Sequence, residues 1–211
     1  MADAAALIEA ARALDALGFM PSKSGNLSVR TARGYLITPA ALPYAETTAA
    51  DLVELDLAGA VVAGHRRPSS EWRLHAAIYA ARPEAGAVVH THSPFATALS
   101  CARQGLPPFH YMIALGGGGD IRCSGYATFG TEELAAACIA ALDGRRAALL
   151  AYHGAGAFGT TLAGARTLAM EVENLARQYL ALRAAGLAPV LLDEAELAEV
   201  LAQFGGYGRL G

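Results

Sequence analysis

The 211-residue sequence contains a single lysine, Lys23, among its 16 basic residues. An enzyme that forms a Schiff base needs a lysine whose amine is desolvated, so that its pKa falls toward neutrality. Lys23 stands in the polar stretch SKSGN, where such desolvation is hard to arrange. The scarcity of lysine therefore disfavours chemistry that runs through a covalent lysine adduct.

Cysteine, charge and long apolar runs are also limited. The three cysteines are odd in number and have no metal-type spacing, which predicts reduced thiols in a cytoplasmic protein. No stretch approaches the roughly 18 consecutive apolar residues of a membrane helix, and the N-terminal 20 residues have a helical pattern with acidic positions instead of the basic start of a signal peptide. A net charge of −3 predicts neither nucleic acid nor a membrane surface as a partner.

Alternating helical and strand patterns predict an α/β fold in one domain, residues 1–211, with helices covering a mixed or antiparallel sheet. Helices are expected at 3–18, 69–82, 95–103, 131–142 and 161–186, with a short one after Pro189. Strands are expected at 27–31, 34–39, 53–57, 59–64, 85–90, 108–115 and 145–153. Two glycine-rich stretches, 116–120 and 154–159, are expected as turns.

Three histidines stand at the predicted ends of apolar strands. In GAVVHTH, His90 and His92 are two residues apart and share one face of a strand, and His153 follows the apolar run AALLAY. A lone histidine at a strand end is more often a satisfied polar residue, and H-x-H alone is weak evidence. The third histidine favours a catalytic zinc site, which takes three protein ligands and keeps one position open.

Glu71 is expected in the first turn of the helix 69–82. A carboxylate there gains about 0.3–1 kcal/mol from the helix dipole, so a purely structural role is one interpretation. A general base beside the metal is the other. His75 lies four residues further on and could form a separate metal pair with Glu71, but its apolar neighbours favour packing.

Two polar stretches predict an anion site. Ser69 and Ser70 offer hydroxyls and free backbone N–H groups at a helix start. The loop KSGNLS adds the charge of Lys23, a glycine at position 25 for close backbone approach, and the amide of Asn26. Each stretch alone is an ordinary cap or turn, but beside a metal site they indicate a phosphorylated small molecule bound across two loops.

Taken together, these residues resemble the class II aldolase/adducin superfamily, and most closely its zinc-dependent L-fuculose-1-phosphate aldolases. The resemblance runs nearly end to end and is carried by the motifs SGNLSVR, LITP, PSSEWRLH, AVVHTH, HYMIA, YATFGT, HGAGAFG, EVENLARQYL and PVLLDE. It implies a three-layer α/β/α fold around a largely antiparallel central sheet. It also implies a homotetramer with active sites between subunits.

The resemblance also assigns roles to individual residues. The ligands of one Zn²⁺ per subunit would be Glu71, His90, His92 and His153, and Glu71 would also act as acid and base. The phosphate-binding positions would be Asn26, Ser69 and Ser70, with Gly25 beside them. Tyr111 would serve the aldehyde-side hydroxyl from a neighbouring subunit, and Phe129 and Tyr207 would lie near the aldehyde, Tyr207 on a mobile tail.

Two positions depart from the aldolase pattern. The Thr-Gly pair expected after LITP is replaced by Ala40-Ala41, which removes a hydroxyl contact to phosphate, and Lys23 stands where the aldolases carry threonine. We expect the charge of Lys23 to compensate for the lost hydroxyl. If it does, the phosphate site is retained.

The resemblance implies reversible cleavage of a ketose 1-phosphate of the L-fuculose 1-phosphate type. The products would be dihydroxyacetone phosphate and a small aldehyde such as L-lactaldehyde. Alternatives are a 5-deoxyribulose or 5-methylthioribulose 1-phosphate aldolase, a sugar-phosphate epimerase or dehydratase on the same scaffold, and a non-catalytic adducin-like module. The retained histidines and Glu71 argue against the last, because a binding module needs no metal site.

Overall fold

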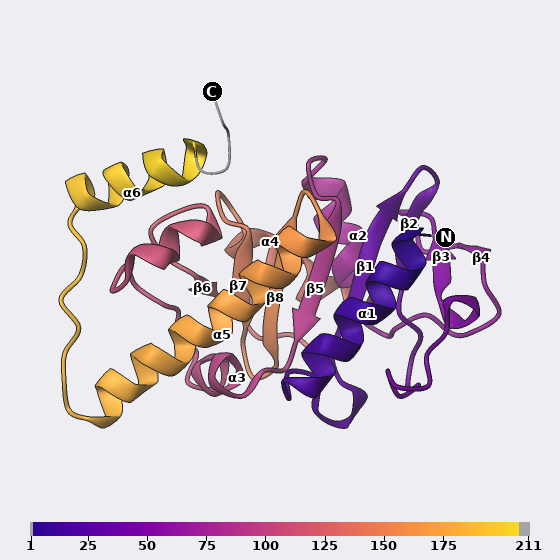
Figure 1. Cartoon of the computed structure of the whole chain (residues 1–211), viewed down its shortest axis with the longest axis horizontal. Helices are drawn as coiled ribbons and strands as arrows, with labels where there is room; N and C mark the ends of the chain where they lie inside the picture. Colours follow the sequence, from indigo (N-terminus) through magenta and orange to yellow (C-terminus); the bar gives the residue numbers. More distant parts are fainter. Residues whose placement is uncertain (1, 207–211) are drawn as a thin grey trace.

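Within residues 2–206, the part of the chain that the computed structural model describes, eight strands form one sheet (Figure 1). Their order across the sheet is β4-β3-β2-β1-β5-β8-β7-β6. The strands are β1 (Asn26–Thr31), β2 (Gly34–Ile37), β3 (Val53–Leu55), β4 (Val61–Ala63), β5 (Ala87–Thr91), β6 (Arg122–Cys123), β7 (Ala147–Leu150) and β8 (Gly154–Gly159). All neighbouring strands are antiparallel except β6 and β7, which are parallel. The predicted, largely antiparallel sheet is confirmed.

Helices cover both faces of the sheet. One layer contains α1 (Ala2–Ala16), α3 (Pro94–Cys101) and α5 (Leu162–Ala184), and the other contains α2 (Trp72–Ala81) and α4 (Glu132–Ala141) (Figure 1). Side chains of β5 alternate between the layers, because Ala87 and Val89 join the apolar cluster under α1 and α5 whereas Val88 joins the cluster under α2 and α4. This arrangement confirms the three-layer α/β/α fold.

Shorter elements complete the described chain. The 3-10 helices are η1 (Pro21–Lys23), η2 (Ala49–Asp51) and η3 (Tyr111–Gly116), and the last helix, α6 (Glu194–Gly206), packs on η3. Among residues 2–206 there is no helix with the length and apolar character needed to cross a membrane.

The strand predicted at 108–115 is wrong, because this segment contains the 3-10 helix η3. The ring Nδ1 of His110 accepts the backbone N–H of Met112 and so caps a helical turn. Of the buried residues Ile113, Ala114 and Gly116, the first and last are three residues apart, which is one turn of a 3-10 helix and places both on its inner face. Apolar content alone did not distinguish this spacing from a strand.

The turn predicted at 154–159 is also wrong, because these residues form β8 in the middle of the sheet. Glycine serves here for close packing. A Cβ on Gly159 would lie 2.6 Å from the backbone nitrogen of Ala165 in α5, and one on Gly154 would lie 2.2 Å from the carbonyl oxygen of Thr91. Both distances are too short for a side chain, so glycine lets α5 and β5 approach the strand.

Candidate metal centre and substrate pocket

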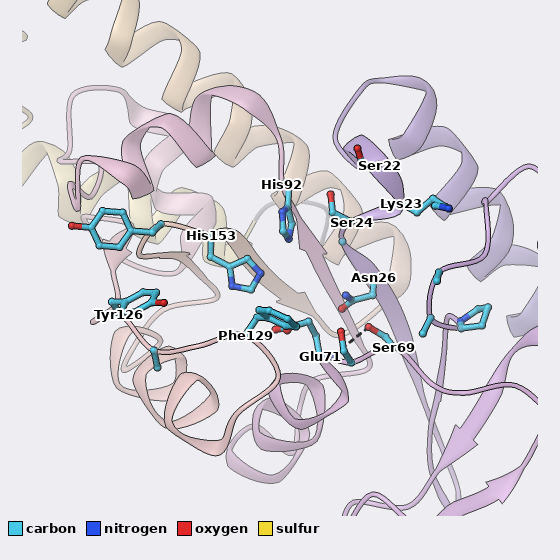
Figure 2. Close-up of a pocket in the computed structure, with 17 residues that line it drawn as sticks. Ser22, Lys23, Ser24, Asn26, Ser69, Glu71, His92, Tyr126, Phe129 and His153 are labelled. Carbon is cyan, nitrogen blue, oxygen red and sulfur yellow. Dashed lines mark hydrogen bonds between the residues drawn. The ribbon is translucent and has the colours of Figure 1, made fainter.

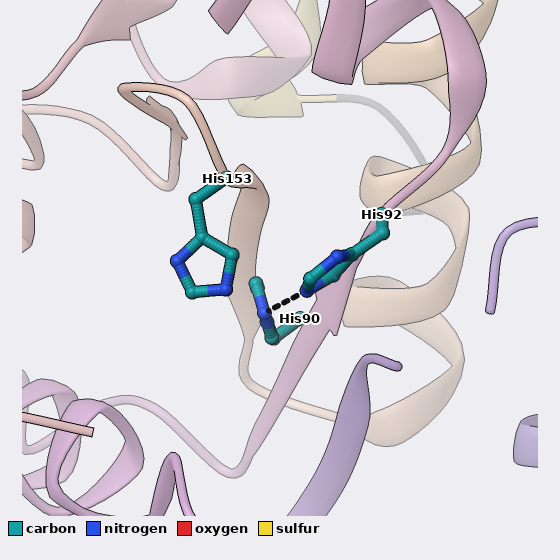
Figure 3. A group of neighbouring side chains, drawn as sticks. All are labelled: His90, His92 and His153. Carbon is teal, nitrogen blue, oxygen red and sulfur yellow. Dashed lines mark hydrogen bonds between the residues drawn. The ribbon is translucent and has the colours of Figure 1, made fainter. Parts of the chain in front are cut away.

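Three histidines meet at one end of the central strands. His90 is in β5, His92 directly follows it, and His153 lies in the tight turn between β7 and β8 (Figure 3). Their ring centroids are 4.7 to 4.8 Å apart, and one nitrogen from each ring lies within 4.8 Å of the others. The structure thus brings together the three histidines predicted as ligands, with the strand register of β5 and β8 holding them in place.

The protonation of the histidines suits metal binding. Nδ1 of His90 donates to the carbonyl oxygen of Ala155 at 3.0 Å, which leaves the lone pair of Nε2 directed at the other rings. Burial lowers the pKa of His90 well below its usual value, lowers the pKa of His92 to about 4, and lowers the pKa of His153. All three rings are therefore neutral at pH 7, the form in which histidine binds a metal.

Glu71 lies in the same pocket but outside the group of three histidines. It precedes α2, which begins at Trp72, so the expectation that Glu71 lies inside the first helical turn is wrong by one residue. Its side chain is 4% exposed, and neither carboxylate oxygen makes a hydrogen bond of normal geometry within residues 2–206; the backbone N–H of Gly130 is a nearby donor that only partly offsets the effect of burial on its pKa. Burial raises the pKa of Glu71 to about 7. A buried carboxyl group without such a hydrogen bond is costly for folding alone and is typical of a functional acid or base.

His75 is not a metal ligand in this arrangement. Its Nδ1 lies 2.6 Å from the hydroxyl of Ser28 and its Nε2 lies 2.5 Å from Oδ1 of Asn26, so both ring nitrogens have partners. The possible metal pair of Glu71 and His75 is therefore not formed, and the expectation that His75 packs inside the protein is confirmed, since it is fully buried.

A cavity of about 480 Å³ joins the predicted metal and phosphate positions (Figure 2). Its size is in the range of small-molecule sites. The lining residues include most positions predicted from the sequence, namely Lys23, Gly25, Asn26, Ser69, Ser70, Glu71, His92, Phe129 and His153. Figure 2 shows Asn26, Ser69 and Glu71 gathered on one side of the cavity, with His92 and His153 across from them.

Strained backbone is concentrated around this cavity. Among the described residues, five other than glycine have positive φ, and four of them line the cavity: Ser22, Lys23, Ala41 and Tyr152. Each such conformation costs roughly 1–3 kcal/mol and persists only where the surroundings enforce it. Gly25 also has positive φ, and a Cβ there would lie 2.8 Å from the carbonyl oxygen of His90. The backbone of this loop therefore packs closely against the strand that carries His90.

Lys23 lines the same cavity as the two alanines that depart from the aldolase pattern. Figure 2 shows the Lys23 side chain at the rim, directed away from the histidines. Substitution of Lys23 tests whether its amine reaches the position of the missing hydroxyl.

The remaining predicted residues lie elsewhere. Tyr111 is in η3, 54% exposed and stacked on His110 with ring centroids 4.8 Å apart, and it does not line the cavity of its own chain. Tyr207 lies outside the described residues.

Sequence reasoning missed Tyr126 and Tyr152, which line the cavity as an edge-to-face pair with ring centroids 5.6 Å apart. Their positions in the sequence could have identified them, because Tyr126 begins the motif YATFGT and Tyr152 directly precedes His153.

Residues 5–180 match the family described as the class II aldolase and adducin N-terminal domain, and the chain belongs to this family. It is a class II aldolase, a lyase of the metal-dependent type. The chain is 50% identical over 203 residues to the 5-methylthioribulose-1-phosphate/5-deoxyribulose-1-phosphate aldolase of Rhodospirillum rubrum, covering 96% of this chain and 90% of that one. It is 45% identical to the L-fuculose phosphate aldolase of Escherichia coli K12, covering 96% and 94%.

A solved L-fuculose 1-phosphate aldolase has the same fold, with a TM-score of 0.92 at 38% identity and 96% of both chains covered. The arrangement of the residues also fits a resident divalent metal: three neutral imidazoles converge, and the buried Glu71 carboxylate in the same pocket makes no hydrogen bond of normal geometry within residues 2–206. Imidazole nitrogens with a carboxylate nearby are a donor set that zinc favours.

Proposed function

We propose that the protein is a zinc-dependent aldolase that reversibly cleaves a ketose 1-phosphate to dihydroxyacetone phosphate and a small aldehyde. The observation that supports this most is that His92, His153 and the buried carboxylate of Glu71 line one cavity with Asn26, while the fully buried His90 lies within 4.8 Å of the other two histidines. His90, His92 and His153 would hold the metal, and Glu71 would be a fourth ligand in the resting site. When bound, the metal would supply a Lewis acid that polarises the oxygens of the reacting carbons.

The residues of the chain supply binding and proton transfer. Asn26, Ser69 and Ser70 provide an amide and two hydroxyls at the end of the cavity where we place the phosphate, with Lys23 at its rim. This corner fixes C1 of the ketose, so that C2 to C4 extend toward the histidines.

The reaction moves one proton off the substrate and one onto it. As the C3–C4 bond breaks, the C4 hydroxyl loses its proton, its oxygen becomes the aldehyde oxygen, and C3 keeps the electron pair of the bond. Glu71, with a pKa of about 7, can carry a proton at neutral pH and deliver it to C3. Together, the two products contain all the atoms of the substrate.

Tyr111 is the residue that we assign to the C4 hydroxyl proton, acting from a neighbouring copy of the chain. Its exposure and its absence from the cavity of its own chain support this assignment. The assignment requires an oligomer, which we propose to be a homotetramer with active sites between subunits.

The aldehyde product can belong to one of two classes, which differ in polarity. L-lactaldehyde, from L-fuculose 1-phosphate, carries a hydroxyl, whereas 5-deoxyribulose and 5-methylthioribulose 1-phosphates release less polar aldehydes. The exposed aromatic side chains of Phe129, Tyr126 and Tyr152 at the cavity favour an apolar aldehyde tail. The 50% identical relative is named for the second class.

Comparing kcat/KM for L-fuculose, 5-deoxyribulose and 5-methylthioribulose 1-phosphates tests the choice. A ratio above about tenfold for the 5-deoxy or methylthio ketose would assign the apolar aldehyde, and the reverse ratio would assign L-lactaldehyde. Turnover of a sugar phosphate without aldehyde release would instead indicate an epimerase or dehydratase and contradict the proposal.

A further inference from the structure

A chain of four buried polar side chains runs from the interior of the protein to the cavity. Asn26 and Ser28 are two residues apart on β1 and so share the face of the sheet under α2. His75 and Tyr79 are four residues apart on α2 and share the face of the helix toward β1. The two spacings match, and the resulting contacts are Tyr79 hydroxyl to Ser28 hydroxyl at 2.8 Å, Ser28 to His75 Nδ1 at 2.6 Å, and His75 Nε2 to Asn26 Oδ1 at 2.5 Å.

The protons in this chain can run in only one direction if every donor is to have an acceptor. The hydroxyl of Tyr79 has one acceptor within residues 2–206, the oxygen of Ser28, because its other neighbour, the backbone N–H of Val88, can only donate to it. Ser28 then donates to Nδ1 of His75, so the neutral ring carries its proton on Nε2 and donates to Oδ1 of Asn26. In the reverse order the proton of Tyr79 would have no acceptor, at a cost that burial makes large.

This direction determines how the Asn26 amide is turned. With Oδ1 engaged by His75, the NH₂ group of Asn26 makes no hydrogen bond to the described protein and is free for the cavity that Asn26 lines. Turned the other way, Asn26 would present a carbonyl oxygen, which repels an anion. An asparagine held by no partner would exchange between the two orientations.

We propose that His75 is a positioning residue that, with Ser28 and Tyr79 behind it, holds the amide of Asn26 with its donors toward the substrate phosphate. This inference rests on the proposed function, in which Asn26 binds the phosphate. His75 does not touch the substrate and is not a catalytic residue. Its effect is expected in phosphate-ester affinity and KM, while kcat is retained.

The test compares two replacements of the same ring. His75→Gln places an amide N–H near the position of Nε2 and can still donate to Asn26, whereas His75→Asn reaches only the position of Nδ1, near Ser28. Titration calorimetry of the zinc-loaded variants with dihydroxyacetone phosphate gives Kd, and the retro-aldol assay gives KM and kcat separately. Metal content and the midpoint of thermal unfolding are measured for each variant.

We expect His75→Asn to raise Kd and KM about tenfold with kcat within about threefold of wild type, and His75→Gln to restore most of the affinity. Ser28→Ala, which removes the group that fixes the His75 tautomer but leaves the helix intact, should raise Kd by about threefold. If His75→Asn fails to fold, the Kd of Ser28→Ala tests the inference in its place.

Equal Kd values for the wild type, His75→Asn and Ser28→Ala would overturn the inference, as would an equal loss of affinity in His75→Asn and His75→Gln, which indicates packing alone. Failure of the proposed function is distinguishable, because the wild-type protein itself would then neither bind nor release dihydroxyacetone phosphate.

Discussion

The Nε2 atoms of His90 and His92 lie 3.0 Å apart. Two nitrogens bound to a tetrahedral zinc ion at 2.0–2.1 Å are about 3.3 Å apart, so metal binding would require only a small adjustment of these rings. The fully buried His90 is fixed by its hydrogen bond to Ala155 in β8, which limits the movement it can make. The protein thus prepares much of the ligand geometry through the pairing of β5 with β8.

Removing one of the three rings should weaken metal binding strongly. We expect His153→Ala to reduce bound zinc from about one per chain to a small fraction after dialysis, because the site loses one of its three imidazoles and keeps only two imidazoles and the Glu71 carboxylate. Elemental analysis after dialysis measures this, with His65→Ala as the matched control, since His65 is exposed and does not line the cavity. Full zinc content in His153→Ala would contradict the assignment of the ligands.

Glu71 should be needed for turnover more than for metal binding. Glu71→Gln keeps the shape of the side chain but can neither accept nor deliver the proton, so kcat should fall by about 10²-fold or more while the histidines retain zinc. Steady-state kinetics and metal analysis of the same sample separate the two effects. Glu133→Gln, on the exposed side of α4, is the control. A kcat near that of wild type would exclude Glu71 as the acid.

Lys23 should contribute to phosphate binding. We expect Lys23→Ala to raise KM for a ketose 1-phosphate about tenfold, because Ala40 and Ala41 offer no hydroxyl in its place. Adding Ala40→Thr to this variant should recover part of the loss. If KM is unchanged in Lys23→Ala, the lysine does not compensate for the missing contact.

The neutral state of His75 should make stability depend on pH. Burial lowers the pKa of His75 from 6.5 to about 3 in the folded protein. The stabilisation that depends on its neutral form is therefore present above pH 6.5 and is lost as the pH falls toward 3. Between pH 7 and pH 5 the wild type should lose about 2 kcal/mol more unfolding free energy than His75→Gln, as measured by urea denaturation. Parallel losses in the two proteins would mean that His75 takes up its proton at the same pH in the folded protein as in the unfolded chain.

Tyr111 should act across a subunit boundary. Tyr111→Phe and His153→Ala should each be nearly inactive, but mixed oligomers formed by refolding the two variants together should regain activity, because some sites then combine an intact Tyr111 with intact histidines. Activity of the mixture is compared with that of each variant refolded alone. No recovery in demonstrably mixed oligomers would place Tyr111 outside the neighbouring site.

The sequence predicted much of this site because its pattern reports local geometry directly. The spacing of His90 and His92 places both on one strand face, and Ser69 to Glu71 precede a recognisable helix. Contacts between segments that are far apart in the sequence could not be predicted from these local patterns. Residues 154–159 resemble a turn until the close approach of α5 and β5 explains their glycines. The partners of His75 come from β1, 47 and 49 residues away, so helix periodicity predicted its burial but not its hydrogen bonds.

The most direct test of the zinc aldolase assignment is release of dihydroxyacetone phosphate from a ketose 1-phosphate, read by a coupled dehydrogenase. We expect release by the purified protein, loss of release after chelation and dialysis, and recovery when zinc is added back. No release by the zinc-loaded protein from L-fuculose, 5-deoxyribulose or 5-methylthioribulose 1-phosphate would contradict the assignment and favour an epimerase or dehydratase. Release that is unaffected by complete removal of metal would contradict the role of the three histidines.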